Sequence, residues 1–160
     1  MRGSRAERDG ALPGQLALET YKLIPTRQLV EVVRRTENPW VGVCLDAANC
    51  LASLESPLDV AAAVAPAVSA VHVKDFAYER RDGGAGFQVS GRPLGHGQLD
   101  YRAVLDAFGP QCYSISLILE HWLPWQGSDK ATCDTEAEGT EHGVRVLLDY
   151  QSARSAETNC

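Results

Sequence analysis

The sequence predicts an α/β fold built from four consecutive strand–helix units. Short, nearly continuous apolar runs alternate along the chain with segments whose apolar residues recur at helical spacing. Strands that alternate with helices in this way form right-handed parallel βαβ units. In addition, each apolar run ends on or beside a side chain that can bind a metal or transfer a proton.

The first two units follow this pattern closely. Gln15–Glu19 is a short apolar run that ends in an acid, and Thr26–Arg35 follows as a helix with Thr26 as its expected N-cap. Trp40–Leu45 is almost entirely apolar, which suits a strand that is buried on both faces. The helix expected over 57–67 begins with proline, a residue favoured in the first helical turn.

The last two units enclose a long glycine-rich segment. Ser69–Lys74 is the third expected strand, and the polar stretch 76–97 after it is expected to be a loop of a length that usually carries function or is disordered. A helix over 101–108 leads to the fourth strand at 114–119. A final helix is expected within 135–150, where apolar residues share one face.

Length and composition restrict the class of protein. The 160 residues, 44% hydrophobic and 22% charged, predict one folded domain over 1–150 and a polar tail over 151–160. The net charge of −6 argues against a nucleic-acid partner. No apolar run reaches the roughly 18 residues of a membrane span, and the first ten residues hold no hydrophobic signal segment. The odd cysteine count without a C-x-x-C pair predicts reduced thiols in a cytoplasmic protein; the cysteines are Cys44, Cys50, Cys112, Cys133 and Cys160.

Four ionisable side chains mark the ends of the four strands. They are Glu19, Asp46, His72 and Glu120, with Lys74 and Asp75 directly after the third strand. Taken singly, each acid is more often a helix cap or a solvated loop residue, and a lone strand histidine is more often a core residue. Because parallel strands end at one common edge, the four side chains are expected to converge. Three carboxylates and one imidazole suit Mn²⁺ or Mg²⁺, with Co²⁺ or Zn²⁺ as further options.

Five ordered segments carry a family resemblance: LALET, VGVCLDAAN, AVHVKDF, PLGHGQLDY and ISLILEHW. Their order and spacing over residues 5–150 resemble the xylose isomerase-like TIM barrel superfamily, which includes sugar phosphate isomerases and epimerases and apurinic-site endonucleases. The resemblance implies (β/α) units of a TIM barrel, with about four of its eight strands present. The matched segments correspond to the second half of the family barrel.

The resemblance also implies roles for individual residues. Glu19 and Glu120 would each bind the metal and act as an acid or base, and Asp46 and His72 would complete the metal site. The implied activity is that of a metal-dependent sugar or sugar phosphate isomerase or epimerase that works through an enediolate.

The resemblance also bears on the residues that would contact the substrate. Where many epimerases of the superfamily read D-x-x-H, this chain ends the motif in Asn49, which can bind a hydroxyl but cannot exchange a proton. That form looks like the 3-oxoisoapionate decarboxylase-like subgroup, so a decarboxylase on a sugar acid is the alternative activity. Lys74 and Arg92 could hold a substrate carboxylate or phosphate, and an ordinary surface role is equally expected for each.

The length leaves two other readings open. A closed eight-stranded barrel typically needs about 250 residues, so four units predict an N-terminal truncation that leaves two sheet edges unpaired. The chain would then be a non-catalytic remnant, or two halves would pair in a homo-oligomer. An apurinic-site endonuclease is the least expected activity, because the chain has only four histidines and is acidic.

Overall fold

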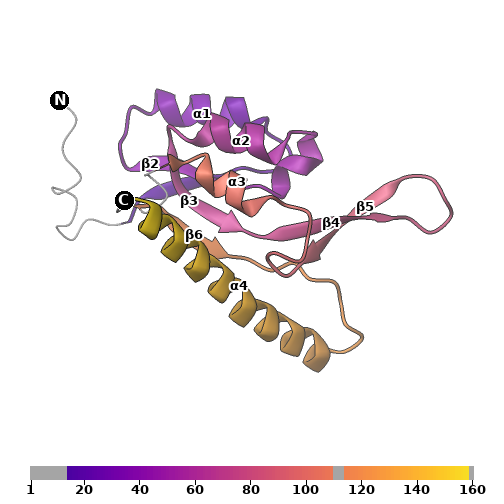
Figure 1. Cartoon of the computed structure of the whole chain (residues 1–160). Helices are drawn as coiled ribbons and strands as arrows, with labels where there is room; N and C mark the ends of the chain where they lie inside the picture. Colours follow the sequence, from indigo (N-terminus) through magenta and orange to yellow (C-terminus); the bar gives the residue numbers. More distant parts are fainter. Residues whose placement is uncertain (1–13, 110–113, 159–160) are drawn as a thin grey trace.

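Four parallel strands form the main sheet of the molecule. The computed structural model describes residues 14–109 and 114–158. Within them the sheet has the order β1-β2-β3-β6, and every neighbouring pair is parallel (Figure 1). The strands are β1 (Leu16–Glu19), β2 (Val41–Asp46), β3 (Val68–Val73) and β6 (Ser116–Leu119). The α/β class and the four parallel strands expected from the sequence are confirmed.

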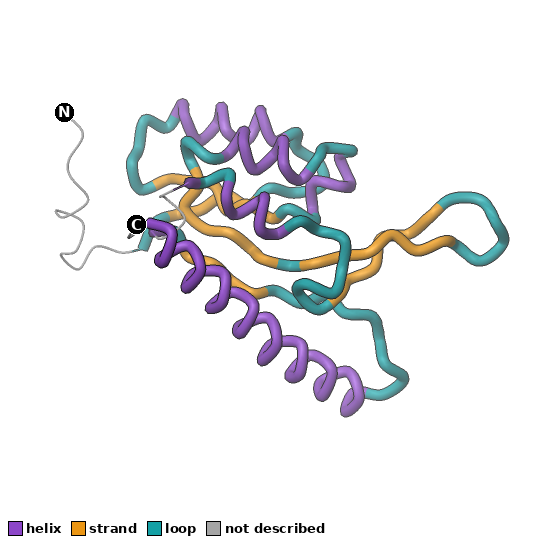
Figure 2. The backbone as a smooth tube through the Cα atoms, viewed as in Figure 1, coloured by secondary structure: helices purple, strands orange, loops and turns teal. Residues whose placement is uncertain are grey.

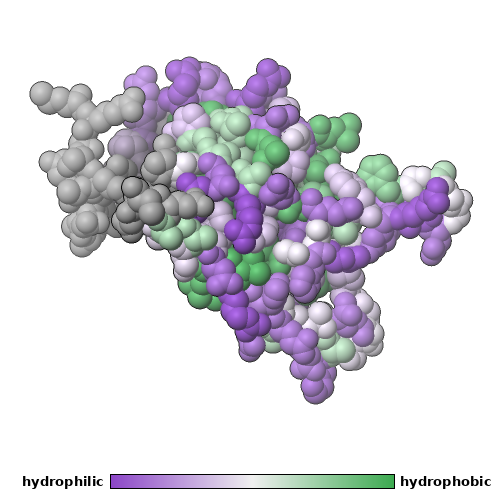
Figure 3. All heavy atoms as spheres, viewed as in Figure 1, coloured by the Kyte–Doolittle hydropathy of each residue, from purple (hydrophilic) through white to green (hydrophobic). Residues whose placement is uncertain are grey.

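The helices cover one face of this sheet and leave the other face bare. They are α1 (Thr26–Arg35), α2 (Pro57–Val64), α3 (Tyr101–Asp106) and α4 (Asp129–Thr158), with a 3₁₀ turn, η2 (Asn49–Ser53), after β2. Figure 2 shows these helices arranged along the strands that they connect. In Figure 3 hydrophilic side chains cover much of the visible surface of the helices.

The hydrophobic core lies between the sheet and the helices. Val43 and Leu45 of β2 are fully buried there, because alternate residues of a strand point to opposite faces. They belong to one cluster with Leu29 of α1 and Val64 of α2. The intervening side chains of β2 point to the bare face, and the last of them is Asp46. The alternation therefore supplies a core on one face and a site on the other.

The sheet is open at both edges. Among the described residues, β1 pairs only with β2 and β6 pairs only with β3. Large apolar side chains are exposed near these edges, namely Leu16, Ile118, and Val144 and Leu148 of α4. In a closed barrel no strand has a free edge. The molecule is thus a partial barrel with four strands, as the sequence predicts.

The segment expected as one long loop contains a β-hairpin, so that prediction is wrong for most of its length. Strands β4 (Asp75–Arg80) and β5 (Phe87–Arg92) are antiparallel and project from the end of β3 (Figure 1). Tyr78 and Phe87 stack edge to face with ring centroids 5.3 Å apart. Three of the glycines that suggested a loop, Gly83, Gly84 and Gly86, lie in the turn between the strands and have positive φ angles.

The start of α1 differs by one residue from the prediction. The N-cap position is Pro25, and Thr26 is the first helical residue. Glu55 takes over the capping role from a distant part of the chain, because its carboxylate accepts hydrogen bonds from the Thr26 backbone N (3.2 Å) and Oγ1 (2.9 Å). A cap supplied from another segment leaves no local sequence pattern.

The last helix is longer than the sequence indicated. It spans Asp129–Thr158, so the polar segment after residue 150 continues the helix. The hydroxyls of Ser152 and Ser155 donate to the backbone carbonyls four residues earlier, and Arg154 pairs with Asp106, the last residue of α3. These contacts let a polar sequence stay helical without an apolar face. Cys112, Cys160 and the first 13 residues lie outside the described part of the chain.

Candidate metal centre

The four ionisable residues predicted at the strand ends meet at one edge of the sheet. The parallel register places Asp46 of β2 opposite His72 of β3, and Glu19 of β1 opposite Cys44, two residues before Asp46. Glu120 follows β6, and its backbone N donates to the Val73 carbonyl at 3.1 Å. Strand pairing alone therefore brings together side chains that are far apart in the sequence.

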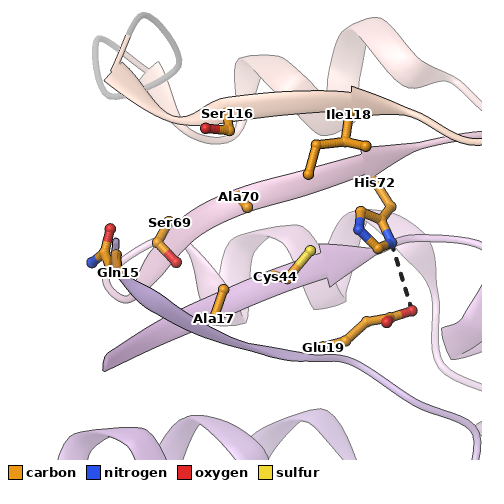
Figure 4. Close-up of a pocket in the computed structure, with 9 residues that line it drawn as sticks. All are labelled: Gln15, Ala17, Glu19, Cys44, Ser69, Ala70, His72, Ser116 and Ile118. Carbon is orange, nitrogen blue, oxygen red and sulfur yellow. Dashed lines mark ion pairs between the residues drawn. The ribbon is translucent and has the colours of Figure 1, made fainter. Parts of the chain in front are cut away.

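The distances within the cluster are those of a potential ligand set. One donor atom each of Glu19, Asp46 and His72 lies within 4.8 Å of the others. His72 Nδ1 is 3.7 Å from Glu19 Oε1 and 2.8 Å from Glu120 Oε2. Figure 4 shows the Glu19 and His72 side chains turned toward each other on the bare face of the sheet. The sequence-predicted ligand set is thus assembled, with Glu120 reaching it through His72.

The two carboxylate oxygens of Asp46 have different surroundings: one binds backbone amides and the other faces the cluster. Oδ1 accepts hydrogen bonds from the backbone N of Ala48 and of Asn49, both at 3.0 Å. Thr20 fixes the same residue through its backbone, because its Oγ1 donates to the Asp46 carbonyl and accepts from the Asp46 backbone N. Oδ2 makes no hydrogen bond of standard geometry and stays buried. One oxygen of a rigidly held carboxylate therefore faces the site, where the Lys74 ammonium lies 2.6 Å from it.

Lys74 joins two of the candidate ligands. Its Nζ lies 2.6 Å from Asp46 Oδ2 and 2.9 Å from Glu120 Oε1, and the side chain is only 7% exposed. Burial alone would lower the pKa of Lys74, but the close contacts of its ammonium with the carboxylates of Asp46 and then of Glu120 outweigh it, so the pKa is raised. The lysine stays charged and partly neutralises the carboxylates.

The donor set fits a divalent cation. Asp46 Oδ2 and His72 Nδ1 are both buried without a hydrogen bond of standard geometry, although charged groups lie close to each. Buried polar atoms left in this state require an explanation, and a bound cation supplies one. Three carboxylates and an imidazole nitrogen match the oxygen-rich coordination of Mg²⁺ or Mn²⁺.

The three residues predicted to contact substrate are not all placed together. Asn49 lies beside the cluster, where its Nδ2 donates to Glu19 Oε1 at 2.9 Å. Lys74 lies inside it, as described above. Arg92 is on β5, where its guanidinium pairs with Glu79 and donates to Ser90 Oγ and the Gly91 carbonyl. The structure gives Arg92 no contact with the cluster, and the prediction that it binds substrate stays a prediction.

Asp75 organises the loop beside the site instead of joining the cluster. Its buried carboxylate accepts backbone hydrogen bonds from Phe76, Gly95, Gly97 and Leu99, at 2.8–3.0 Å. A Cβ on Gly97 would overlap this carboxylate, so the position requires glycine. The glycine-rich loop thus has a structural basis that the sequence could not reveal, because the loop partners of Asp75 lie 20 to 24 residues after it.

Two hollows adjoin the cluster. The larger, of about 370 Å³, is lined by the bare face of the strands and includes Glu19, Cys44 and His72 (Figure 4). In a closed barrel this space is filled by side chains, so it is packing volume. The smaller, of about 230 Å³, lies beside Asn49 and Lys74 and is also lined by Lys22 and Trp122. Sequence reasoning missed Lys22, because a lysine in a loop carries no signal of its own.

Comparison with known proteins decides the family. The sequence matches the xylose isomerase-like TIM barrel family over residues 5–150. The chain belongs to this family. It is 44% identical over 133 residues to a 3-oxo-isoapionate decarboxylase of Pectobacterium atrosepticum, an alignment that covers 83% of this chain and 48% of that protein. The chain therefore spans about half the length of this relative.

Solved structures of xylose isomerase-like proteins share the fold. A xylose isomerase domain protein from Planctomyces limnophilus superimposes with a TM-score of 0.63 at 20% identity, over 91% of this chain and 47% of that one. A xylose isomerase-like TIM barrel protein from Mycobacterium smegmatis, solved in complex with magnesium, gives 0.60 at 23% identity, over 85% and 44%. At these identities the likeness concerns the fold. Across the described residues, no helix combines the length and apolarity that crossing a membrane requires.

Proposed function

We propose that this chain carries the metal-binding and acid–base half of a metal-dependent decarboxylase that acts on a small sugar acid bearing a keto group. The observation that carries the proposal is the convergence of Glu19, Asp46, His72 and Glu120 at one sheet edge. The 44% identical relative, whose name describes the decarboxylation of a 3-oxo acid, supports this choice of reaction.

The residues of the cluster have distinct tasks in this reaction. When bound by the four side chains, a divalent ion would supply positive charge that polarises the substrate carbonyl. The bond between the carboxylate carbon and its neighbour breaks, CO₂ leaves, and the electron pair moves onto the carbon–carbonyl unit. Glu120 or Glu19, in its protonated form, then donates a proton to that carbon. Both carboxylates are more than a third exposed, so each can reach a substrate above the sheet edge.

A sugar isomerase or epimerase is the second candidate, because the same two glutamates can remove and return a proton beside a carbonyl. Asn49 favours the first candidate, since an amide at that position holds the Glu19 carboxylate but adds no proton-transfer group. The two activities are separated by incubating the protein with a keto sugar acid and with the matching neutral keto sugar in ²H₂O. The decarboxylase releases CO₂ from the acid, whereas the isomerase incorporates deuterium into the neutral sugar.

The open sheet bears on this function, because a barrel enzyme needs a closed interior. We propose that two copies of the chain pair about an axis along the barrel, so that β6 of each copy lies beside β1 of the other. All eight strands would then be parallel, as the family barrel requires. The pairing would cover Leu16 and Ile118 at the edges and the exposed flank of α4, Val144 and Leu148.

Metal binding tests the central proposal. We expect the protein to bind Mn²⁺ in isothermal titration calorimetry, and His72→Ala to weaken the binding at least tenfold, about 1.4 kcal/mol. His142→Ala is the matched control, because it removes an imidazole from α4, whose described ring contact is with His96. Absence of Mn²⁺ binding by the unaltered protein, or equal affinity in His72→Ala, contradicts the proposal.

A further inference from the structure

The hollow of about 230 Å³ beside the candidate metal centre has the character of a substrate subsite. Its volume lies below the roughly 300 Å³ at which sites for drug-sized ligands begin, so it suits a small molecule. It touches the cluster on two sides, because Asn49 donates to Glu19 and Lys74 pairs with Asp46 and Glu120. A molecule in the hollow would therefore lie directly against the candidate ligands.

The walls of this hollow are unequal in character. Leu51 of η2 and Val89 of β5 give the lining apolar surface. The indole of Trp122 also lines the hollow. Its Nε1 donates to the Asp75 carbonyl at 3.1 Å, and its ring centroid lies 6.0 Å from Lys74 Nζ. Lys22, an exposed residue, also lines the hollow. A cationic side chain suits the binding of a carboxylate, and apolar side chains suit the neutral CO₂ that it becomes.

Charge decides which of the two lysines is free to bind an anion. The three carboxylates of the cluster and Lys74 together carry a net charge of −2, with His72 neutral as a ligand, and a divalent cation would neutralise it. Lys74 is thus committed to the cluster. The described contacts give Lys22 no carboxylate partner; its Nζ lies 5.9 Å from the centroid of the Tyr21 ring. Of the two lysines that line the hollow, Lys22 is therefore the one whose charge no described carboxylate balances.

The backbone of Lys22 is held in position for this role. Ser53 Oγ of η2 donates to the Lys22 carbonyl at 3.0 Å and ties the loop after β1 to the wall of the hollow. This hydrogen bond holds the start of the Lys22 side chain beside the hollow, from which an exposed lysine side chain is long enough to reach a bound anion.

Resting on the proposed function, we infer that Lys22 is the residue that recognises the substrate carboxylate, and that the site selects singly charged sugar acids over sugar phosphates. A phosphate monoester carries close to two negative charges at neutral pH, and one lysine beside a neutralised metal centre balances only one. A neutral sugar would gain nothing from Lys22.

Isothermal titration calorimetry with three probes tests the inference. The probes are D-ribonate, which carries one carboxylate, neutral ribitol, and ribose 5-phosphate, each titrated into the Mn²⁺-treated protein. We expect D-ribonate to bind more tightly than either other probe, and Lys22→Met to weaken it about tenfold, which corresponds to the loss of one charge-assisted contact. Lys130→Met is the matched control, because it removes the same charge from α4, where Lys130 pairs with Asp134.

The outcomes separate the inference from the proposed function. D-ribonate affinity that is unchanged in Lys22→Met, or undetectable in every variant, overturns the inference. Tighter binding of ribose 5-phosphate that depends on Lys22 overturns the choice of a carboxylate. The Mn²⁺ titration tests the metal site independently. If Mn²⁺ binds but D-ribonate affinity does not depend on Lys22, only the inference about Lys22 is refuted. If D-ribonate binding depends on Lys22 but Mn²⁺ does not bind, only the metal mechanism is refuted.

Discussion

Replacing Lys74 by methionine would show how much the lysine charge stabilises the buried carboxylate of the metal centre. Lys74→Met keeps the aliphatic stem of the side chain but removes the ammonium that lies 2.6 Å from Asp46 Oδ2. The partner carboxylate is completely buried, so it would be left charged without a counter-ion. We expect the variant to be markedly less stable than the unaltered chain in the absence of metal.

The size of this effect follows from the two contacts that are lost. Removing one partner of a buried ion pair costs about 3–5 kcal/mol, and the backbone hydrogen bonds that Asp46 Oδ1 retains favour the lower end of that range. The second contact, to Glu120, adds less than about 1 kcal/mol because that carboxylate is 38% exposed. The expected loss is therefore about 3 kcal/mol in the free energy of unfolding.

Urea unfolding followed by circular dichroism measures this loss, in EDTA and again with saturating Mn²⁺. With Mn²⁺ the difference in unfolding free energy between the variant and the unaltered protein should shrink. The cation replaces the missing positive charge, and it binds more tightly to the variant site because that site is more negative by one unit. The double variant Asp46→Asn with Lys74→Met should recover more than half of the loss in EDTA. Lys130→Met, which breaks an exposed pair, should change stability by about 0.5 kcal/mol or less. A Lys74→Met protein within about 1 kcal/mol of the unaltered chain in EDTA would refute the reasoning.

Two further predictions concern thiol reactivity and assembly. Burial, with a smaller contribution from Glu55, raises the pKa of the Cys50 thiol to about 12, so about one part in ten thousand is thiolate at pH 8. After iodoacetamide treatment of the native protein, peptide mass spectrometry should find the exposed Cys133 alkylated and Cys50 unmodified. The reactivity of Cys50 should rise as the pH rises. Rapid labelling of Cys50 at pH 8 would contradict its burial. Sedimentation equilibrium of the unaltered protein should give a mass of twice the 17.3 kDa of one chain, whereas Leu148→Asp should give the mass of a monomer. Leu58→Asp is the control, because Leu58 of α2 is also exposed but lies outside the proposed contact. A monomeric unaltered chain would exclude pairing of two copies.

The order and type of the parallel strands could be read from the sequence, because each is a short apolar run that stands out from its surroundings. The four candidate ligands could be read for a related reason. Parallel strands end at one edge, so the residues Glu19, Asp46, His72 and Glu120 had to approach one another once the strands were assigned. Features that depend on local residue patterns were thus accessible without coordinates.

Contacts between distant segments could not be predicted in the same way. The hairpin β4–β5 was hidden by glycines that serve its turn, and Glu55 caps α1 from a position 29 residues away from Thr26. Asp75, one of the residues noted at the end of β3, binds the backbone N of Phe76 and three backbone amides of the loop after β5 instead of joining the cluster. In each case a side chain finds its partner only after the chain has folded.

The sequence by itself therefore determined the α/β class, the four strands and the identity of the residues at the candidate metal centre. Only the tertiary structure decided how these residues are used: Asp46 gives one oxygen to its loop and one to the site, Lys74 neutralises two carboxylates, and Lys22 reaches a hollow beside them. The physical reason is that strand pattern is set by neighbours along the chain, whereas burial and charge pairing are set by neighbours in space.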